Sequence, residues 1–300
     1  MRVEVLRDEA QQTVWGWKIA AYLFGAGMGA GAYAAGAATA LLPGWGSASE
    51  ARVYMAVGTA TVLASVPLLV WDLGRPERFL RVLLKVRRSW LSRGAWILLL
   101  FGALAVTTLV LGVPRWLAGL SLAAAVAVAL YTGLLMGSMV ARPLWNSPIL
   151  PVLFLVSAFS TGLALVRLVS IAASNGSAGA SLPAPSLLPS VEVGLLATET
   201  LVLYFYLAIA YLRIRTPVES LLYGHLAPTF WLGVVGIGLI IPLVLQIGRV
   251  HLAGSAAARV ELLADACLLA GGFLLRYVLL RAGVRGPAYL GAPFVIRPEV

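Results

Sequence analysis

Several ionisable residues stand inside long apolar stretches of this sequence, where charged side chains are uncommon. Arg167 is in one stretch, and Glu192 and Glu199 are seven residues apart in the next. Glu261 and Asp265 are four residues apart in the last stretch. In a helix, seven residues make about two turns and four residues about one, so each pair of acids lies near one face. Carboxyl groups at successive depths of an apolar medium can pass protons along, and a mobile aromatic ligand needs only a few polar groups, so this spacing predicts a proton path or a quinone pocket.

The same residues have a simpler interpretation as ion pairs, because a charge buried in a helical bundle needs a partner. In this interpretation Arg167 pairs with Glu199. The other expected pairs join an acid of the last apolar stretch to an arginine near its outer end: Glu261 or Asp265 with Arg249 or Arg259. Both interpretations fit the sequence.

Tyr131 is a second candidate for chemistry because of its depth. It lies about fifteen residues into its apolar stretch, too deep for the interfacial position that most membrane tyrosines take. A buried phenol normally finds a hydrogen-bond partner. That partner is either another side chain or the carbonyl of a small ring ligand such as a quinone.

Positive charge is concentrated in one short segment, residues 70–96, which reads VWDLGRPERFLRVLLKVRRSWLSRGAW. Seven of the chain's 22 Lys and Arg residues stand here, and two acids, Asp72 and Glu77, come near its start. The simplest role of such a cluster is to orient the protein in a membrane and to bind anionic headgroups.

The composition excludes a soluble protein. Hydrophobic residues make up 61% of the 300 residues, charged residues 11%, and the mean hydropathy is +0.94. A soluble domain carries roughly 25% charged residues. Backbone groups in lipid must be satisfied internally, which allows helices or a closed barrel. Because the apolar runs are long, rich in Leu and Ala and do not alternate, they predict an all-α, polytopic membrane helix bundle.

The runs predict about eight transmembrane helices within one integral membrane domain, residues 1–300. The expected spans are approximately 14–42, 52–72, 93–112, 116–140, 147–173, 190–213, 226–249 and 255–281. A polar segment, 1–13, precedes them, a basic loop covers 73–92, and a low-complexity flexible loop covers 174–189. Glycines spaced by four in GAGMGAGAYAAGA, residues 25–37, predict close helix packing in the first span.

An even number of spans places both termini on one side. That side holds sixteen Lys and Arg residues, against four on the other. The positive-inside rule then predicts cytoplasmic termini in a multi-pass protein of the cell's inner membrane. The net charge of +10 is explained by these loops, so we expect no nucleic-acid partner.

Few residues are available to hold a resident metal group. The single cysteine, Cys267, excludes a thiolate iron–sulfur cluster within the chain. The two histidines, His225 and His251, fall close to predicted helix ends, so we expect no haem. Carboxylates without histidine or cysteine are a poor set for a transition metal, and we expect no metal site.

Two motifs around the basic segment carry a family resemblance. DLGRPERF at residues 72–79 and SWLSRGAW at 89–96 resemble the signature of the NrfD/PsrC family, the membrane subunits of polysulfide reductase and related molybdopterin oxidoreductases. The glycine-rich first span, Tyr131-Thr-Gly, Pro143-Leu-Trp-Asn, and Gly271-Gly272 with Arg276-Tyr277 are also similar to that family. The resemblance extends over nearly the whole chain.

The resemblance implies a haem-free, quinone-reactive membrane anchor that takes menaquinone or ubiquinone as its substrate. Such a subunit exchanges electrons with a ferredoxin-like iron–sulfur subunit, which serves a molybdopterin-type or other catalytic subunit. In polysulfide reductase that partner lies outside the cytoplasm, near the start of the first helix. The charge count places this end in the cytoplasm, so the two indications disagree on the docking side.

The resemblance also implies quinone-binding residues. Tyr131 matches the family's pocket tyrosine, while the family's histidine and asparagine positions fall at Tyr22 and Ile19. Tyr22 can donate a hydrogen bond but cannot hold a proton near neutral pH as histidine can. Lys18 stands next to Ile19 and is expected to compensate for it. Asp72 and Arg75 are expected to pair across the Gly-Arg-Pro turn and to close the pocket.

Two other functions remain open at this point. Intramembrane acids are also typical of an ion- or proton-coupled transporter or channel. A purely structural anchor without a quinone is the other. Quinone retained by the purified protein favours the redox function, and ion-driven uptake by the isolated protein favours transport.

Overall fold

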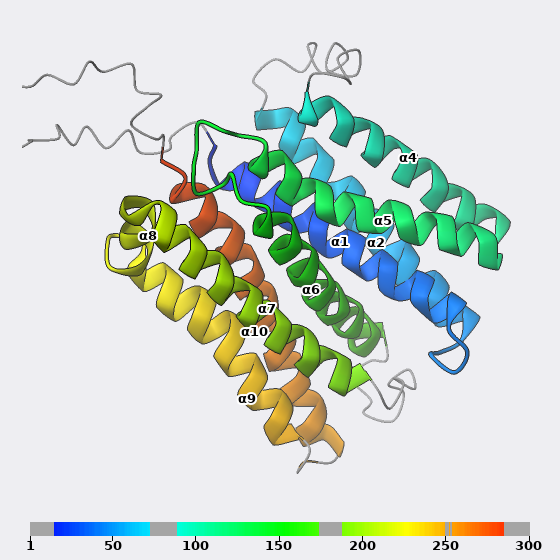
Figure 1. Cartoon of the computed structure of the whole chain (residues 1–300). Coiled ribbons are helices and arrows are strands. Elements are labelled where there is room, and N and C mark those ends of the chain that lie inside the picture. The colour runs from blue at the N-terminus through cyan, green and yellow to red at the C-terminus, as the bar shows by residue number, and fades with distance from the viewer. Residues whose placement is uncertain (1–14, 73–88, 174–187, 250–251, 253, 285–300) are drawn as a thin grey trace, which may run out of the picture.

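The computed structural model describes residues 15–72, 89–173, 188–249, 252 and 254–284, which form a helical bundle (Figure 1). The described helices, in chain order, are α1 (Trp17–Leu41), α2 (Ala48–Asp72), α4 (Trp90–Leu111), α5 (Arg115–Gly137), α6 (Ile149–Ala173), α7 (Leu188–Arg213), α8 (Arg215–Leu222), η2 (Thr229–Ile240), α9 (Ile241–Gly248) and α10 (Gly254–Arg281).

Seven of the described helical segments are long and apolar enough to cross a membrane, with η2 and α9 counted as one segment. The remaining long helix, α1, has 25 residues, but its five glycines lower its mean hydropathy. Each of the eight expected spans overlaps one of these long segments. The expected all-α membrane bundle is therefore confirmed.

Some helix ends differ by a few residues from the approximate expected bounds, and others fall on undescribed residues. The expected basic loop reaches residue 92, but α4 begins at Trp90, so nearly all of the SWLSRGAW motif lies in the first turns of this helix. The rest of that loop, most of the 174–189 loop and the 1–13 segment lie outside the described residues. The short helix α8 was not expected.

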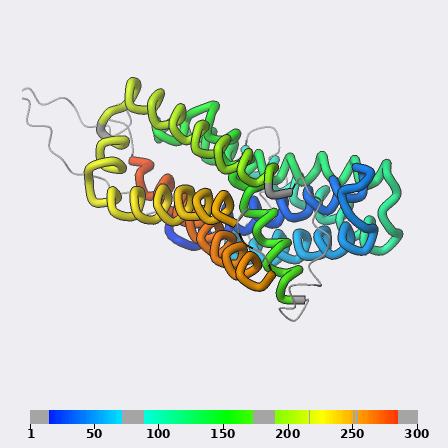
Figure 2. The backbone as a smooth tube through the Cα atoms, turned by 90° about the horizontal axis from the view of Figure 1, so that it is seen from below, coloured from blue at the N-terminus to red at the C-terminus, as the bar shows by residue number. Residues whose placement is uncertain are grey.

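The long helices pack in two groups joined through α1 and α6. One group contains α1, α2, α4 and α5, and the other contains α6, α7, η2 with α9, and α10. Figure 2 shows the blue-to-teal group and the yellow-to-red group on opposite sides of the green α6. α1 contacts α2, α5, α6 and α10, so the first helix lies at the centre of the bundle.

Glycines give α1 its central place, as the spacing predicted. On one face, a Cβ added to Gly29 would lie 2.7 Å from the backbone nitrogen of Val62 in α2. On another face, a Cβ on Gly31 would overlap the carbonyl of Ala158 in α6. Both approaches are too close for any larger side chain, so one glycine face of α1 binds α2 within its own group and the other joins that group to α6.

The helix that precedes α9 is a π-helix, η2, twelve residues long. π-Helical turns are rare and usually mark special local packing. Here a Cβ on Gly238 would lie 2.7 Å from the Cα of Gly271 in α10, so two backbones nearly touch. Pro242, at the start of α9, carries no N–H and therefore cannot continue the hydrogen-bond ladder of η2 unchanged.

The connection between α5 and α6 ties the two ends of the described chain together. Trp145 stacks on Trp15, just before α1, with ring centres 5.3 Å apart. The same indole donates a hydrogen bond of 2.7 Å to the carbonyl of Leu279 near the end of α10. Arg142 donates to the carbonyl of Gly283 and lies over the Trp145 ring. We call this set of contacts the Trp145 clamp.

Candidate functional site

Two buried tyrosines meet near the end of the bundle where α1 begins. Tyr22 lies in the second turn of α1 and Tyr131 about two turns before the end of α5, and both are completely buried. Their hydroxyl groups lie close enough to interact electrostatically. Within the described part of the chain, neither hydroxyl has a hydrogen-bond partner of normal geometry. Because buried hydroxyls are normally satisfied, this pair can serve a ligand or a water that accepts hydrogen bonds.

Gly94, from the SWLSRGAW motif, packs against the ring of Tyr131. A Cβ added to Gly94 would overlap the Cζ, Cε2 and hydroxyl of that tyrosine. The glycine of α4 therefore makes room for the phenol of α5. Ser92, two residues earlier on α4, is also buried, and its hydroxyl has no partner among the described residues. Neither Ser92 nor Gly94 was singled out from the sequence, although both stand in the motif.

The other expected quinone-binding residues are placed less completely. The ammonium group of Lys18 lies 4.2 Å from the centre of the Trp71 ring, so Lys18 links the start of α1 to the end of α2. Ile19 is buried. Asp72 is the last residue of α2, but its side chain and all of Arg75 lie outside the described residues. The expected pair between Asp72 and Arg75 stays a prediction.

Arg167 is paired with two acids, and the expected partner, Glu199, is not one of them. Its Nε donates a hydrogen bond of 3.1 Å to Asp265, its Nη2 binds the other oxygen of Asp265, and its Nη1 binds Glu192. All three side chains are buried. The Arg167–Glu199 pair was wrong because α6 and α7 run in opposite directions. A residue near the end of α6 therefore lies level with Glu192, near the start of α7, and not two turns further on.

Glu199 belongs to a second polar cluster, deeper in the bundle. It accepts a hydrogen bond of 2.8 Å from Ser160 in α6. Arg276 in α10 donates to the hydroxyl of Ser157 at 2.6 Å and to the carbonyl of Gly272 at 2.9 Å. Glu199 also interacts electrostatically with Ser157 and Arg276. Two serines one turn apart on α6 therefore lie between a buried carboxylate and a buried guanidinium.

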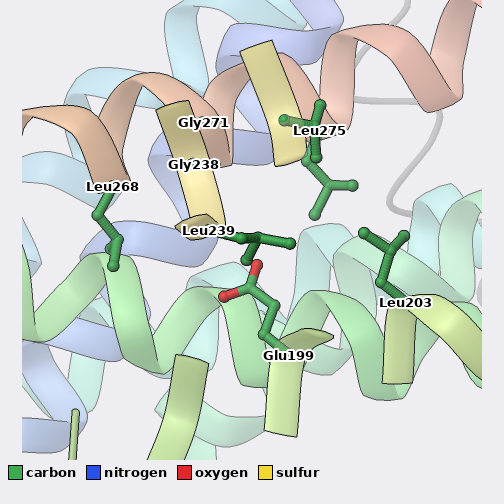
Figure 3. Close-up of a pocket in the computed structure, with 9 residues that line it drawn as sticks. Glu199, Leu203, Gly238, Leu239, Leu268, Gly271 and Leu275 are labelled. Carbon is green, nitrogen blue, oxygen red and sulfur yellow. The ribbon is translucent and has the colours of Figure 1, made fainter. Parts of the chain in front are cut away.

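A small cavity adjoins Glu199, between α7, η2 and α10. Its volume is about 10 Å³, close to the smallest that holds one water molecule. Figure 3 shows the carboxylate of Glu199 pointing from α7 toward Leu239 of η2, beside Gly238 and Gly271. The Glu199 carboxylate thus borders the place where η2 and α10 come closest.

Further polar groups lie toward the end of the bundle opposite the tyrosines. Arg249 pairs with Glu261, which is one of the pairs expected from the sequence. Gln246, one turn before Arg249, is buried, and both atoms of its amide lack partners among the described residues. One oxygen of Glu192 lacks a partner there as well. Gln246 was not singled out from the sequence, because it carries no charge. The feature that could have identified it is its position as the one amide inside the apolar run PLVLQIG.

The described residues contain no group of three or more His, Cys, Asp or Glu side chains arranged to hold a metal ion. The candidate chemistry of this part of the chain therefore rests on the two tyrosines and on the two clusters of paired charges.

Comparison with known proteins relates the chain to one family. The family model described as polysulphide reductase, NrfD, matches residues 6–288. The C subunit of polysulfide reductase from Wolinella succinogenes is 29% identical over 92% of this chain and 96% of its own length. Protein NrfD of Escherichia coli strain K12 is 30% identical over 91% of this chain and 96% of its own length. The match includes the helices that carry the tyrosines and both polar clusters.

Proposed function

Because the chain belongs to the NrfD family of multi-pass membrane proteins, we propose that it is the quinone-reactive membrane subunit of a respiratory oxidoreductase complex. It exchanges electrons between the membrane quinone pool, menaquinone or ubiquinone, and an iron–sulfur partner subunit. The name of one relative, a subunit of polysulfide reductase, supports assembly with a catalytic subunit, for which we propose a molybdopterin type.

One observation carries this proposal: the buried hydroxyls of Tyr22 and Tyr131, which face each other without a normal hydrogen bond. A quinone carbonyl is a hydrogen-bond acceptor, and a quinol hydroxyl is both donor and acceptor. Either fits two phenols from two different helices. The tyrosine hydroxyls would orient the head ring, and Gly94 keeps Tyr131 in place beside it.

Quinol oxidation releases two electrons and two protons, and these need separate routes. The single cysteine cannot hold an iron–sulfur cluster, so the electrons pass to a partner subunit. We propose that this subunit docks at the end of the bundle nearest the tyrosines. The electrons then travel only the short distance from the quinone ring to the partner's iron–sulfur cluster at that end of the bundle, and they do not have to cross the membrane.

We further propose that the buried charges support proton movement. The Arg249–Glu261 pair, the Arg167 cluster and the Glu199 cluster follow one another from the far end of the bundle inward. The unpartnered amide of Gln246 and the water-sized cavity beside Glu199 favour bound water between these groups. Glu199→Gln should leave quinol oxidation largely intact in the assembled complex and lower the protons moved per quinol in proteoliposomes.

The quinone assignment is tested by Tyr131→Phe, which keeps the ring and removes the hydroxyl. A hydrogen bond contributes about 0.5–1.5 kcal/mol net, and 1.4 kcal/mol is roughly tenfold in affinity. We expect the assembled complex to bind a quinone-site inhibitor up to about tenfold more weakly and to oxidise quinol more slowly. Tyr22→Phe should have a smaller effect of the same kind.

Tyr33→Phe is the matched control. Tyr33 is another fully buried tyrosine of α1 without a hydroxyl partner among the described residues, packed edge-on against Phe101 with ring centres 5.0 Å apart. Its substitution should leave inhibitor affinity unchanged. If Tyr131→Phe and Tyr33→Phe behave alike while the complex stays intact, the tyrosine pair is packing and the quinone site lies elsewhere.

A further inference from the structure

A groove distinct from the tyrosine pair opens at the clamped end of the bundle, between the α5–α6 connection and the last turns of α7. Its volume is about 220 Å³. Val140, Ile209 and Ile214 contribute apolar walls, and Asn146 and Arg213 contribute polar atoms. The amide of Asn146 donates a hydrogen bond of 2.8 Å to the carbonyl of Gly137, which fixes that side of the groove.

The groove lies at the level of the membrane surface. α7 ends at Arg213, and the short helix α8 follows it with Val218 and Leu221 buried and Glu219 exposed. Exposed aromatic residues lie at the other end of α8: Tyr223 is 78% exposed, and Trp231, which is 50% exposed, donates a hydrogen bond to the carbonyl of Leu222. Tyrosine and tryptophan gather at membrane–water interfaces. The rim of the groove therefore faces headgroups and its apolar walls face acyl chains.

An exposed apolar stripe leads along α7 to the groove. Phe205, Ile209 and Leu212 are exposed and are spaced by four and three residues, so they share one helix face. Ile209 also lines the groove. An acyl chain that follows this stripe toward the end of the helix brings its headgroup to the last turn, where Arg213 stands.

The charge at the groove is positive. Arg213 is exposed in the last turn of α7, and Arg215 follows two residues later with its guanidinium 5.5 Å from the centre of the Tyr211 ring. None of the described residues that line the groove is acidic. A guanidinium binds phosphate through paired donors, and basic groups at the membrane surface attract anionic lipids.

We propose that this groove binds one anionic phospholipid, with its phosphate at Arg213 and the upper part of one acyl chain against the exposed side chains of Ile209 and Val140. The positive rim favours an anionic ligand, and the apolar stripe on α7 favours one with an acyl chain. A soluble anion would contact only the rim, so the two features together point to a lipid. This lipid site does not depend on the proposed quinone chemistry.

The test uses the full chain purified in detergent and a phosphatidylglycerol that carries a photoreactive group on one acyl chain. Labelled peptides are identified by mass spectrometry, and affinity is taken from competition by unlabelled lipid. We expect labels on residues 140–147 and 205–214, and weaker competition by phosphatidylcholine. Arg213→Gln should weaken phosphatidylglycerol binding about fivefold, which corresponds to about 1 kcal/mol.

Arg52→Gln, which removes an exposed arginine near the start of α2 at the opposite end of the bundle, is the charge control and should change nothing. Ile209→Trp fills the groove from a partly exposed position and should remove its labels while the protein stays folded. Equal losses in Arg213→Gln and Arg52→Gln, equal binding of both lipids, or labels only outside the groove would each overturn the proposal. The same labelling is repeated on the chain within its native complex; labels on the purified chain that are absent from the complex would assign the groove to a protein partner and would overturn the proposal.

Discussion

Gly94→Ala gives the sharpest test of how the tyrosine site is built. The added methyl group would overlap the ring of Tyr131, which is completely buried and cannot turn into solvent. Either α4 moves away from α5 or the phenol leaves its place beside Tyr22. Both changes should weaken inhibitor binding in the assembled complex, in the same direction as Tyr131→Phe.

The size of the effect on stability follows from two opposing terms. Extra volume in a packed interior costs about 1–3 kcal/mol. Replacing glycine with alanine inside a helix contributes about 1 kcal/mol in the opposite direction. We therefore expect Gly94→Ala to lower the free energy of unfolding by up to about 2 kcal/mol. In a Tyr131→Leu background, which removes the overlapping atoms, the same substitution should raise it by about 1 kcal/mol.

A double-mutant cycle measures this reversal of sign. The purified protein is unfolded in mixed detergent micelles and followed by tryptophan fluorescence. Gly102→Ala on the same helix is the control, since a Cβ at Gly102 meets nothing within 4 Å and should be neutral or stabilising. If Gly94→Ala has the same effect with Tyr131 and with leucine at that position, the two residues are not coupled and the reasoning is wrong.

Two other substitutions test the polar and the glycine contacts. Arg167→Gln leaves buried acids without their counter-charge and should lower the free energy of unfolding by about 3–5 kcal/mol, with partial recovery when Asp265→Asn is added; no recovery would mean that the arginine acts through its size. Gly271→Ala forces a methyl group onto the backbone of Gly238 and should cost about 1–3 kcal/mol in the same assay, whereas Gly248→Ala, where a Cβ meets nothing within 4 Å, should be harmless.

The sequence was sufficient for the bundle because lipid restricts the choice of structure so strongly. Apolar runs near 20 residues must be helices. Glycines spaced by four form contact faces, as Gly25 with Gly29 shows toward α2 and Gly27 with Gly31 toward α6. α8 was missed because it has only eight residues and its polar face hides its two buried positions. The π-helical course of η2 was also missed, because π-helical turns are rare and the run TFWLGVVGIGLI has the apolar composition of an ordinary membrane helix.

The sequence identified which residues of the candidate site are unusual, but it did not identify which residues they contact. Sequence spacing identifies Glu192, Glu199 and Asp265 as unusual acids, but it does not say which of them lies level with Arg167. That level is set by where α6 ends and where α7 begins. In the same way, the SWLSRGAW motif draws attention to Gly94 without revealing that its contact is a tyrosine 37 residues later.

The Trp145 clamp has a consequence for biosynthesis. Helices of a membrane protein are made in order, so Trp15 and Trp145 are present long before Leu279 is translated. Until then the indole of Trp145 has no Leu279 carbonyl to bind, and α1 lacks its contact with the last helix. A protein that stops before α10 is complete therefore leaves an open donor at the clamped end.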